Sequence, residues 1–119
     1  MNLTACLADE AINHFGEYLI AAPQLTQDAL VLELHSGVTL QARFASASEY
    51  SIHWRLDATE LRIDTAPLHR ELASFPSHLH AADGSIQIDP LTRPGQDPWV
   101  NLQAVLRAIL LDPHLNQSR

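Results

Sequence analysis

An alternation of apolar and polar side chains between positions 30 and 63 constrains the fold more than any other feature of the chain. Alternation with a period of two is typical of strands that bury one face of a sheet. Gly37 interrupts the pattern, and we expect a tight turn there that places Leu34 opposite Leu40. The sequence therefore predicts an antiparallel meander of about four strands over residues 29–66, with one apolar and one polar face. The apolar positions are Leu30, Leu32, Leu34, Leu40, Ala42, Phe44, Tyr50, Ile52, Trp54, Leu56, Leu61 and Ile63.

The polar face of the second predicted hairpin gathers side chains that could act on a phosphate. Matching the apolar residues of its two strands puts Arg55 opposite Arg62 and His53 opposite Asp64. Side chains directly opposite one another in a sheet are close enough to interact, so two facing arginines repel each other. We expect an anion between them, either a carboxylate of this chain or a ligand.

Helices are predicted on both sides of the meander. Residues 1–22 place an apolar side chain at about every fourth position up to Pro23, as an amphipathic helix does. A second helix is predicted over residues 97–112, because Asp97 is a typical N-cap and a proline follows it. The last residues, 113–119, are expected to form a polar tail. Together with the meander, these helices predict an α+β fold.

The composition describes a small acidic domain. A chain of 119 residues suffices for one hydrophobic core, so residues 1–119 are expected to form a single domain. The net charge is −7 and the chain has no lysine, which excludes Schiff-base lysine chemistry and the lysine of a phosphate-binding P-loop. No apolar run is long enough to span a bilayer, and a single cysteine cannot form an internal disulfide. We therefore expect a cytoplasmic protein that does not engage a membrane.

A long, largely irregular connection over residues 67–96 holds three of the seven histidines and several prolines, and its segment 85–89 could form a short extra strand. Connections of this length are uncommon in compact domains and are usually functional. Imidazole titrates near neutral pH, which suits general acid and base catalysis. We expect the connection to fold as a lid over the polar face of the sheet. The candidate catalytic residues are His53, Asp64, His69, His78 and His80. The candidate substrate-binding residues are Arg55, Arg62 and Arg70.

The same histidines allow two other interpretations. His78 and His80 form a His-x-His pair that Asp64 or a third histidine could complete as an open zinc site. The chain has neither a second cysteine nor a His-Glu-x-x-His helix, so we predict no metal centre and no other cofactor. The histidines could also be ordinary residues of a surface loop.

The segment "LRIDTAPLHRELASFPSHLH" resembles the central motif of the TumE-type toxins of bacterial toxin–antitoxin systems. The matching positions are Arg62, Asp64, Ala66, Pro67, His69, Phe75, Pro76, His78 and His80. The chain departs from that motif at Ile63, Thr65, Leu68, Ser77 and Leu79, where the family pattern has an aromatic residue, asparagine, two histidines and a lysine. The expected order of helix, meander and helix is also similar to that family. The resemblance implies a toxin that acts beside a cognate antitoxin.

Three hypotheses about function follow. The first is a metal-independent endoribonuclease toxin, with arginines that bind the phosphate and histidines that transfer protons. The second is a non-catalytic interaction module whose His/Arg cluster binds a partner protein such as the cognate antitoxin. The third is a zinc hydrolase. The expected partners are the antitoxin and RNA, and the apolar edge of the meander leaves a homodimer open.

Overall fold

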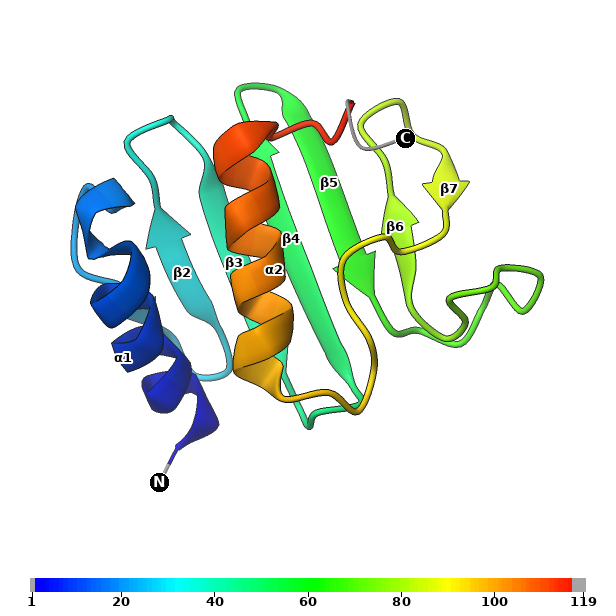
Figure 1. The fold of residues 1–119 in the computed structure, drawn as a ribbon, viewed down its shortest axis with the longest axis horizontal. Coiled ribbons are helices and arrows are strands. Elements are labelled where there is room, and N and C mark those ends of the chain that lie inside the picture. Colours follow the sequence, from blue (N-terminus) through cyan, green and yellow to red (C-terminus); the bar gives the residue numbers. More distant parts are fainter. Residues whose placement is uncertain (1, 117–119) are drawn as a thin grey trace.

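The computed structural model describes residues 2–116, which form an α+β fold of two helices and one antiparallel sheet (Figure 1). The predicted fold class is confirmed, although the sheet has seven strands where about four were expected. The elements are α1 (Leu3–Phe15), the 3₁₀ helix η1 (Gly16–Tyr18), β1 (Gln24–Leu25), β2 (Leu30–Glu33), β3 (Thr39–Phe44), β4 (Tyr50–Leu56), β5 (Thr59–Asp64), β6 (His78–His80), β7 (Ile86–Gln87) and α2 (Pro98–Leu111).

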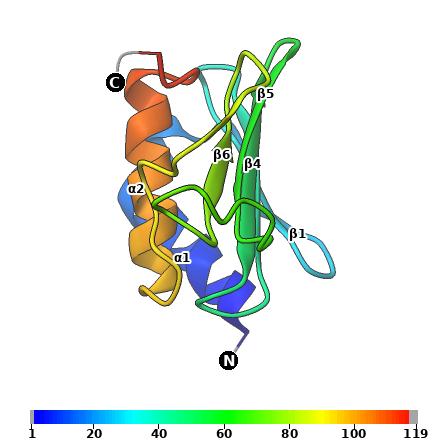
Figure 2. The ribbon, with the colours of Figure 1, turned by 90° about the vertical axis from the view of Figure 1, so that its right-hand side faces the viewer.

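The sheet is a continuous meander in which every strand pairs with the next one along the chain, from β1 to β7. Both helices lie on the same side of this sheet (Figure 2). Along the central strands, buried residues alternate with partly exposed ones, so that one face is packed and the other is not. We call the side away from the helices the open face, and it is the polar face that the sequence predicts.

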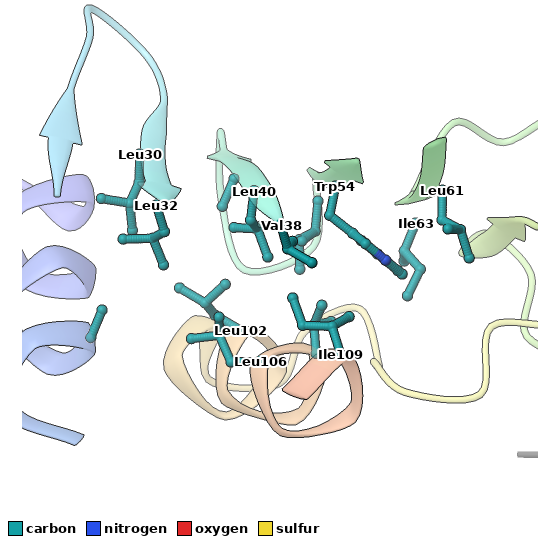
Figure 3. Close-up of a cluster of buried hydrophobic side chains, with 14 of the residues drawn as sticks. Leu30, Leu32, Val38, Leu40, Trp54, Leu61, Ile63, Leu102, Leu106 and Ile109 are labelled. Carbon is teal, nitrogen blue, oxygen red and sulfur yellow. The ribbon is translucent and has the colours of Figure 1, made fainter. Parts of the chain in front are cut away.

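The core lies between the helices and the covered face of the sheet. Leu102, Leu106 and Ile109 of α2 point toward the apolar side chains of the strands (Figure 3). Trp54 at the centre of β4 is fully buried, and its indole Nε1 donates a hydrogen bond of 2.8 Å to the Pro113 carbonyl oxygen. That bond fastens the segment after α2 to the middle of the sheet.

The helices begin at capping residues. The Asn2 side chain accepts hydrogen bonds from two backbone N–H groups at the start of α1, and the Asp97 side chain accepts one from Trp99 N at the start of α2. The first helix is shorter than the predicted 1–22, because it ends at Phe15 and continues only as η1. The second matches the predicted 97–112 within one residue at each end.

The structure also corrects the predicted C-terminal tail. In the predicted tail, 113–119, Leu115 is buried in the core at 2% exposure. Residues 117–119 lie outside the described part. No helix among the described residues has the length and the apolar character needed to cross a membrane.

The predicted registers of both hairpins are wrong by two residues. Leu40 pairs with Leu32, whereas Leu34 was expected there, and Trp54 pairs with Leu61. The cause lies in the turns: only two residues, beginning with Asp57 at a φ of 54°, separate β4 from β5. A shift of two keeps every side chain on its expected face, because the side-chain period of a strand is two.

This correction changes the neighbours on the open face. Arg55 faces Glu60 and not Arg62, so the predicted pair of opposed arginines is absent. His53 faces Arg62 and not Asp64. The expected anion between two arginines is therefore unnecessary, because Glu60 already stands beside Arg55.

The predicted irregular connection over 67–96 is also corrected. Two of its segments pair with the sheet: β6, which was not expected, lies antiparallel to β5, and β7, within the expected extra strand 85–89, lies antiparallel to β6. His78 and His80 are therefore strand residues on β6, and the irregular parts are the stretch before β6 and the one between β7 and α2. Because β6 pairs with β5, the register of the sheet places these histidines.

Candidate active site on the open face

One row of side chains crosses the open face along three neighbouring strands. His53 of β4 is paired with Arg62 of β5, and Arg62 is paired with His80 of β6. Neighbouring strands lie about 4.8 Å apart, so the two histidine backbones are about 10 Å apart with the arginine between them. We call these three residues the histidine row.

At the β6 end of this row, a carboxylate contacts two members of the row and one further histidine. Asp64 lies two residues after Arg62 on β5 and accepts a 2.8 Å hydrogen bond from Arg62 Nε at its Oδ2. Its Oδ1 lies 3.1 Å from His78 Nε2, and its Oδ2 lies 3.3 Å from His80 Nε2. The two imidazoles touch each other, with 3.2 Å between their Nε2 atoms. We call Arg62, Asp64, His78 and His80 the Asp64 cluster.

His78 is the buried member of the cluster. Its side chain is 2% exposed, and its Nδ1 lies 3.3 Å from the Pro76 carbonyl oxygen. A carbonyl oxygen can only accept a hydrogen bond, so Nδ1 carries a proton and donates a hydrogen bond to the Pro76 oxygen. The other ring nitrogen, Nε2, therefore faces Asp64 and His80.

The segment before β6 covers His78 and holds it in this orientation. The His69 ring packs edge-on against the His78 ring, with 4.8 Å between the ring centres. Ser74 Oγ donates to Ser77 O and accepts from Asp89 N, which ties this segment to the one that follows β7. The predicted lid thus covers His78 and leaves His80 partly exposed.

The surroundings set the charge state of two members of the cluster. Burial on its own raises the pKa of Asp64, but the hydrogen bond from Ala66 N and the charges of His78 and Arg62 outweigh it and hold that pKa below the usual 3.8. Burial lowers the pKa of His80, and the Arg62 guanidinium lowers it further. Near neutral pH, Asp64 is therefore a carboxylate and His80 is a neutral imidazole.

The other end of the row has its own carboxylate. His53 Nε2 lies 2.6 Å from Glu60 Oε1, and both side chains are partly exposed. Beside them is a small hollow of about 130 Å³ lined by Thr39, Gln41, His53 and Arg55. Sequence reasoning missed Glu60, because the register expected for this hairpin placed it away from His53. A two-residue turn at Asp57, if expected, would have given the correct register and placed Glu60 near His53.

The structure brings most of the predicted residues together, and Arg70 is the exception. His69 lies against the Asp64 cluster, and Arg55 stands on the open face two residues beyond His53. Arg70 lies over the Phe75 ring, 5.8 Å from its centre, at the outer side of the covering segment.

Comparison with protein families assigns a family to this arrangement. The family model described as Toxin TumE matches residues 6–110, a range that includes all seven strands and every residue of the row and the cluster. The chain belongs to the TumE toxin family. As a TumE toxin it is the toxin component of a toxin–antitoxin system, which implies an antitoxin as partner. Comparisons with curated proteins and with solved structures gave no significant match.

Proposed function

We propose that this TumE toxin is an endoribonuclease that cleaves RNA by acid–base catalysis without a metal ion. The observation that carries the proposal is the histidine row, in which two imidazoles on opposite sides of one guanidinium share the open face. Cleavage of RNA through its own 2′-hydroxyl needs those three functions and no others: a base, an acid and a positive charge at the phosphate.

In the proposed reaction, His80 is the base. Its Nε2 accepts a hydrogen bond of 3.1 Å from Arg62 Nη2 and is therefore unprotonated. RNA binding transfers the Arg62 bond to a phosphate oxygen and leaves Nε2 free to take the proton of the 2′-hydroxyl. The 2′-oxygen then bonds to phosphorus, and the bond from phosphorus to the 5′-oxygen breaks. His53, hydrogen-bonded to Glu60, protonates that leaving oxygen.

Arg62 stabilises the charge that develops on the phosphate. Its side chain is 47% exposed, and Asp64 orients it through Nε, which leaves other N–H groups for a phosphate. His78 is too deeply buried to touch RNA, so it acts as a positioning residue for Asp64 and His80. The products are a 2′,3′-cyclic phosphate and a free 5′-hydroxyl.

The acidic composition limits how RNA reaches the row. With a net charge of −7, the chain cannot attract RNA over long distances through a generally basic surface. Attraction comes instead from the arginines that alternate onto the open face, namely Arg43 of β3, Arg55 of β4 and Arg62 of β5. We therefore expect weak binding that becomes weaker still as salt is added.

The test uses purified, chelator-treated protein and an oligonucleotide that contains one ribonucleotide in a DNA strand. We expect cleavage at the ribonucleotide with a 2′,3′-cyclic phosphate product, and no cleavage of the all-DNA strand. His80→Asn and His53→Asn should each lower the rate about 100-fold or more. His35→Asn, an exposed histidine outside the row, is the control.

The pH profile gives a second readout. Because the pKa of His80 is lowered, the base is unprotonated at neutral pH, and the rate should fall only when the pH drops below that lowered value. His80→Asn should abolish this acidic limb of the profile. A chain that cleaves the substrate equally well with both row histidines replaced, or that never cleaves it, would contradict the proposal.

A second function is favoured by the burial of His78. A histidine at 2% exposure with its hydrogen bonds inside the chain is what a structural network needs, and such a network could shape the open face for a protein partner. In that case the row variants would lose antitoxin binding while the wild type cleaves no RNA.

A further inference from the structure

The hydrogen bonds of the Asp64 cluster leave one position without a proton donor. Arg62 supplies two N–H groups, one to Asp64 Oδ2 and one to His80 Nε2, and Ala66 N donates to Asp64 Oδ1. His78 donates through Nδ1 to Pro76. When the His78 ring is neutral with its proton on Nδ1, its Nε2 carries a lone pair. That lone pair faces the Asp64 carboxylate and the lone pair of His80 Nε2.

Three acceptor atoms that face one another suit a cation between them. A cation with suitable chemistry is zinc, which binds neutral imidazole and carboxylate. The Nδ1–H bond to Pro76 is the kind of outer contact that fixes a zinc-binding histidine with its Nε2 toward the metal.

The spacing of the three ligand atoms fits such an ion. Zinc bonds of about 2.0–2.1 Å in tetrahedral geometry place neighbouring ligand atoms about 3.3 Å apart. In the cluster, His78 Nε2 lies 3.2 Å from His80 Nε2, and the two imidazoles lie 3.1 and 3.3 Å from different oxygens of Asp64, Oδ1 and Oδ2 respectively. With one ligand atom taken from each residue, the three atoms all lie within 4.8 Å of one another. Because β5 and β6 are paired strands, backbone hydrogen bonds of the sheet hold the residues that carry these atoms side by side.

We propose that Asp64, His78 and His80 bind one zinc ion. Three protein ligands leave a fourth coordination position open. Arg62 Nη2, which contacts His80 Nε2 in the metal-free arrangement, must move aside, and its 47% exposed side chain has room to do so.

Zinc binding has a consequence for the proposed ribonuclease, and this part rests on that function. Bound zinc occupies His80 Nε2, the atom that takes the proton of the 2′-hydroxyl. It also displaces Arg62 from the cluster. Zinc therefore inhibits the toxin, and removal of zinc by a chelator restores its activity.

The binding test needs no activity. Chelator-treated and then chelator-free protein is titrated with Zn²⁺ by calorimetry and with Co²⁺ by visible absorption. We expect one ion per chain. Asp64→Asn and His80→Asn should each weaken binding at least 100-fold, while His35→Asn binds like the wild type. Circular dichroism confirms that the variants are folded.

The outcomes separate this inference from the proposed function. No binding, or binding that survives in both cluster variants, overturns the zinc site even if the protein cleaves RNA. Zinc binding without any cleavage supports the site and overturns the ribonuclease. Cleavage by metal-free protein that stops on addition of one equivalent of zinc supports both. Cleavage that requires zinc supports the site and overturns both the inhibitory role and the metal-independent mechanism.

Discussion

The interaction between Asp64 and His78 should be measurable as a coupling free energy. The two changes are Asp64→Asn, which removes the charge and keeps the shape, and His78→Asn. The asparagine amide stands where His78 Nδ1 does and can still donate to the Pro76 carbonyl, whereas the Nε2 that faces Asp64 is lost. The two single variants and the double variant complete a double-mutant cycle.

The size of the coupling follows from burial. The Asp64 side chain is 13% exposed and the His78 side chain 2% exposed, with 3.1 Å between the carboxylate oxygen and Nε2. A hydrogen bond to a charged group contributes about 1.5–3 kcal/mol, and stranding one buried partner adds to the cost of each single change. We expect each single variant to lose about 2–3 kcal/mol, and the double variant to lose about 2 kcal/mol less than their sum.

Urea denaturation at neutral pH measures these free energies of unfolding. The matched control is the exposed pair Asp28 and Arg43, 3.6 Å apart with side chains 74% and 47% exposed, whose coupling should stay below about 0.5 kcal/mol. Additivity within about 0.5 kcal/mol for Asp64 and His78 would refute the reasoning, because it would mean that the two groups do not interact.

The same variants give a pH readout for the carboxylate. The pKa of Asp64 is lower in the folded chain than in the unfolded one. Its contribution to stability is therefore present above the unfolded value of about 3.9 and is lost as the pH falls through the folded value. The stability difference between the wild type and Asp64→Asn should shrink as the pH is lowered from 5 to about 3.

Two further predictions concern buried hydrogen bonds elsewhere. Trp54→Phe should lose about 2–4 kcal/mol in urea denaturation, because it opens a cavity and leaves the Pro113 carbonyl without its indole donor; a loss below about 1 kcal/mol would contradict this role. Burial raises the pKa of Tyr50 to about 12, so the wild type should lose up to about 1.4 kcal/mol per pH unit as the pH rises from 10 toward 12. Tyr50→Phe should lack this alkaline loss.

The sequence identified most residues of the candidate site, but it did not identify the contacts between them. The motif between Arg62 and His80 supplied the members of the Asp64 cluster, and the alternation in β4 and β5 put His53 and Arg62 on the polar face. What could not be predicted was which of these side chains touch. Contacts across a sheet depend on register, and the two-residue turn at Asp57 moved the register of this hairpin by two.

The Asp64 cluster depends on the pairing of β5 with β6, which no local sequence pattern predicts. The strand that carries His78 and His80 has only three residues, too few for periodicity to reveal, and it becomes a strand because the edge of β5 offers hydrogen bonds to it. Residues 66–77 fold back to bring this segment there, and His78 is buried in the folded chain.

The sequence by itself determined the α+β class, the covered and open faces of the sheet and the start of α2, because side-chain period and capping are local properties of the chain. The tertiary structure alone decided that the side chains of Asp64, His78 and His80 lie in contact. It also decided that His53, Arg62 and His80 form a row. Strand pairing brings together residues far apart in the chain, and only hydrogen bonds between strands and the packing beneath them select one register among several with the same pattern.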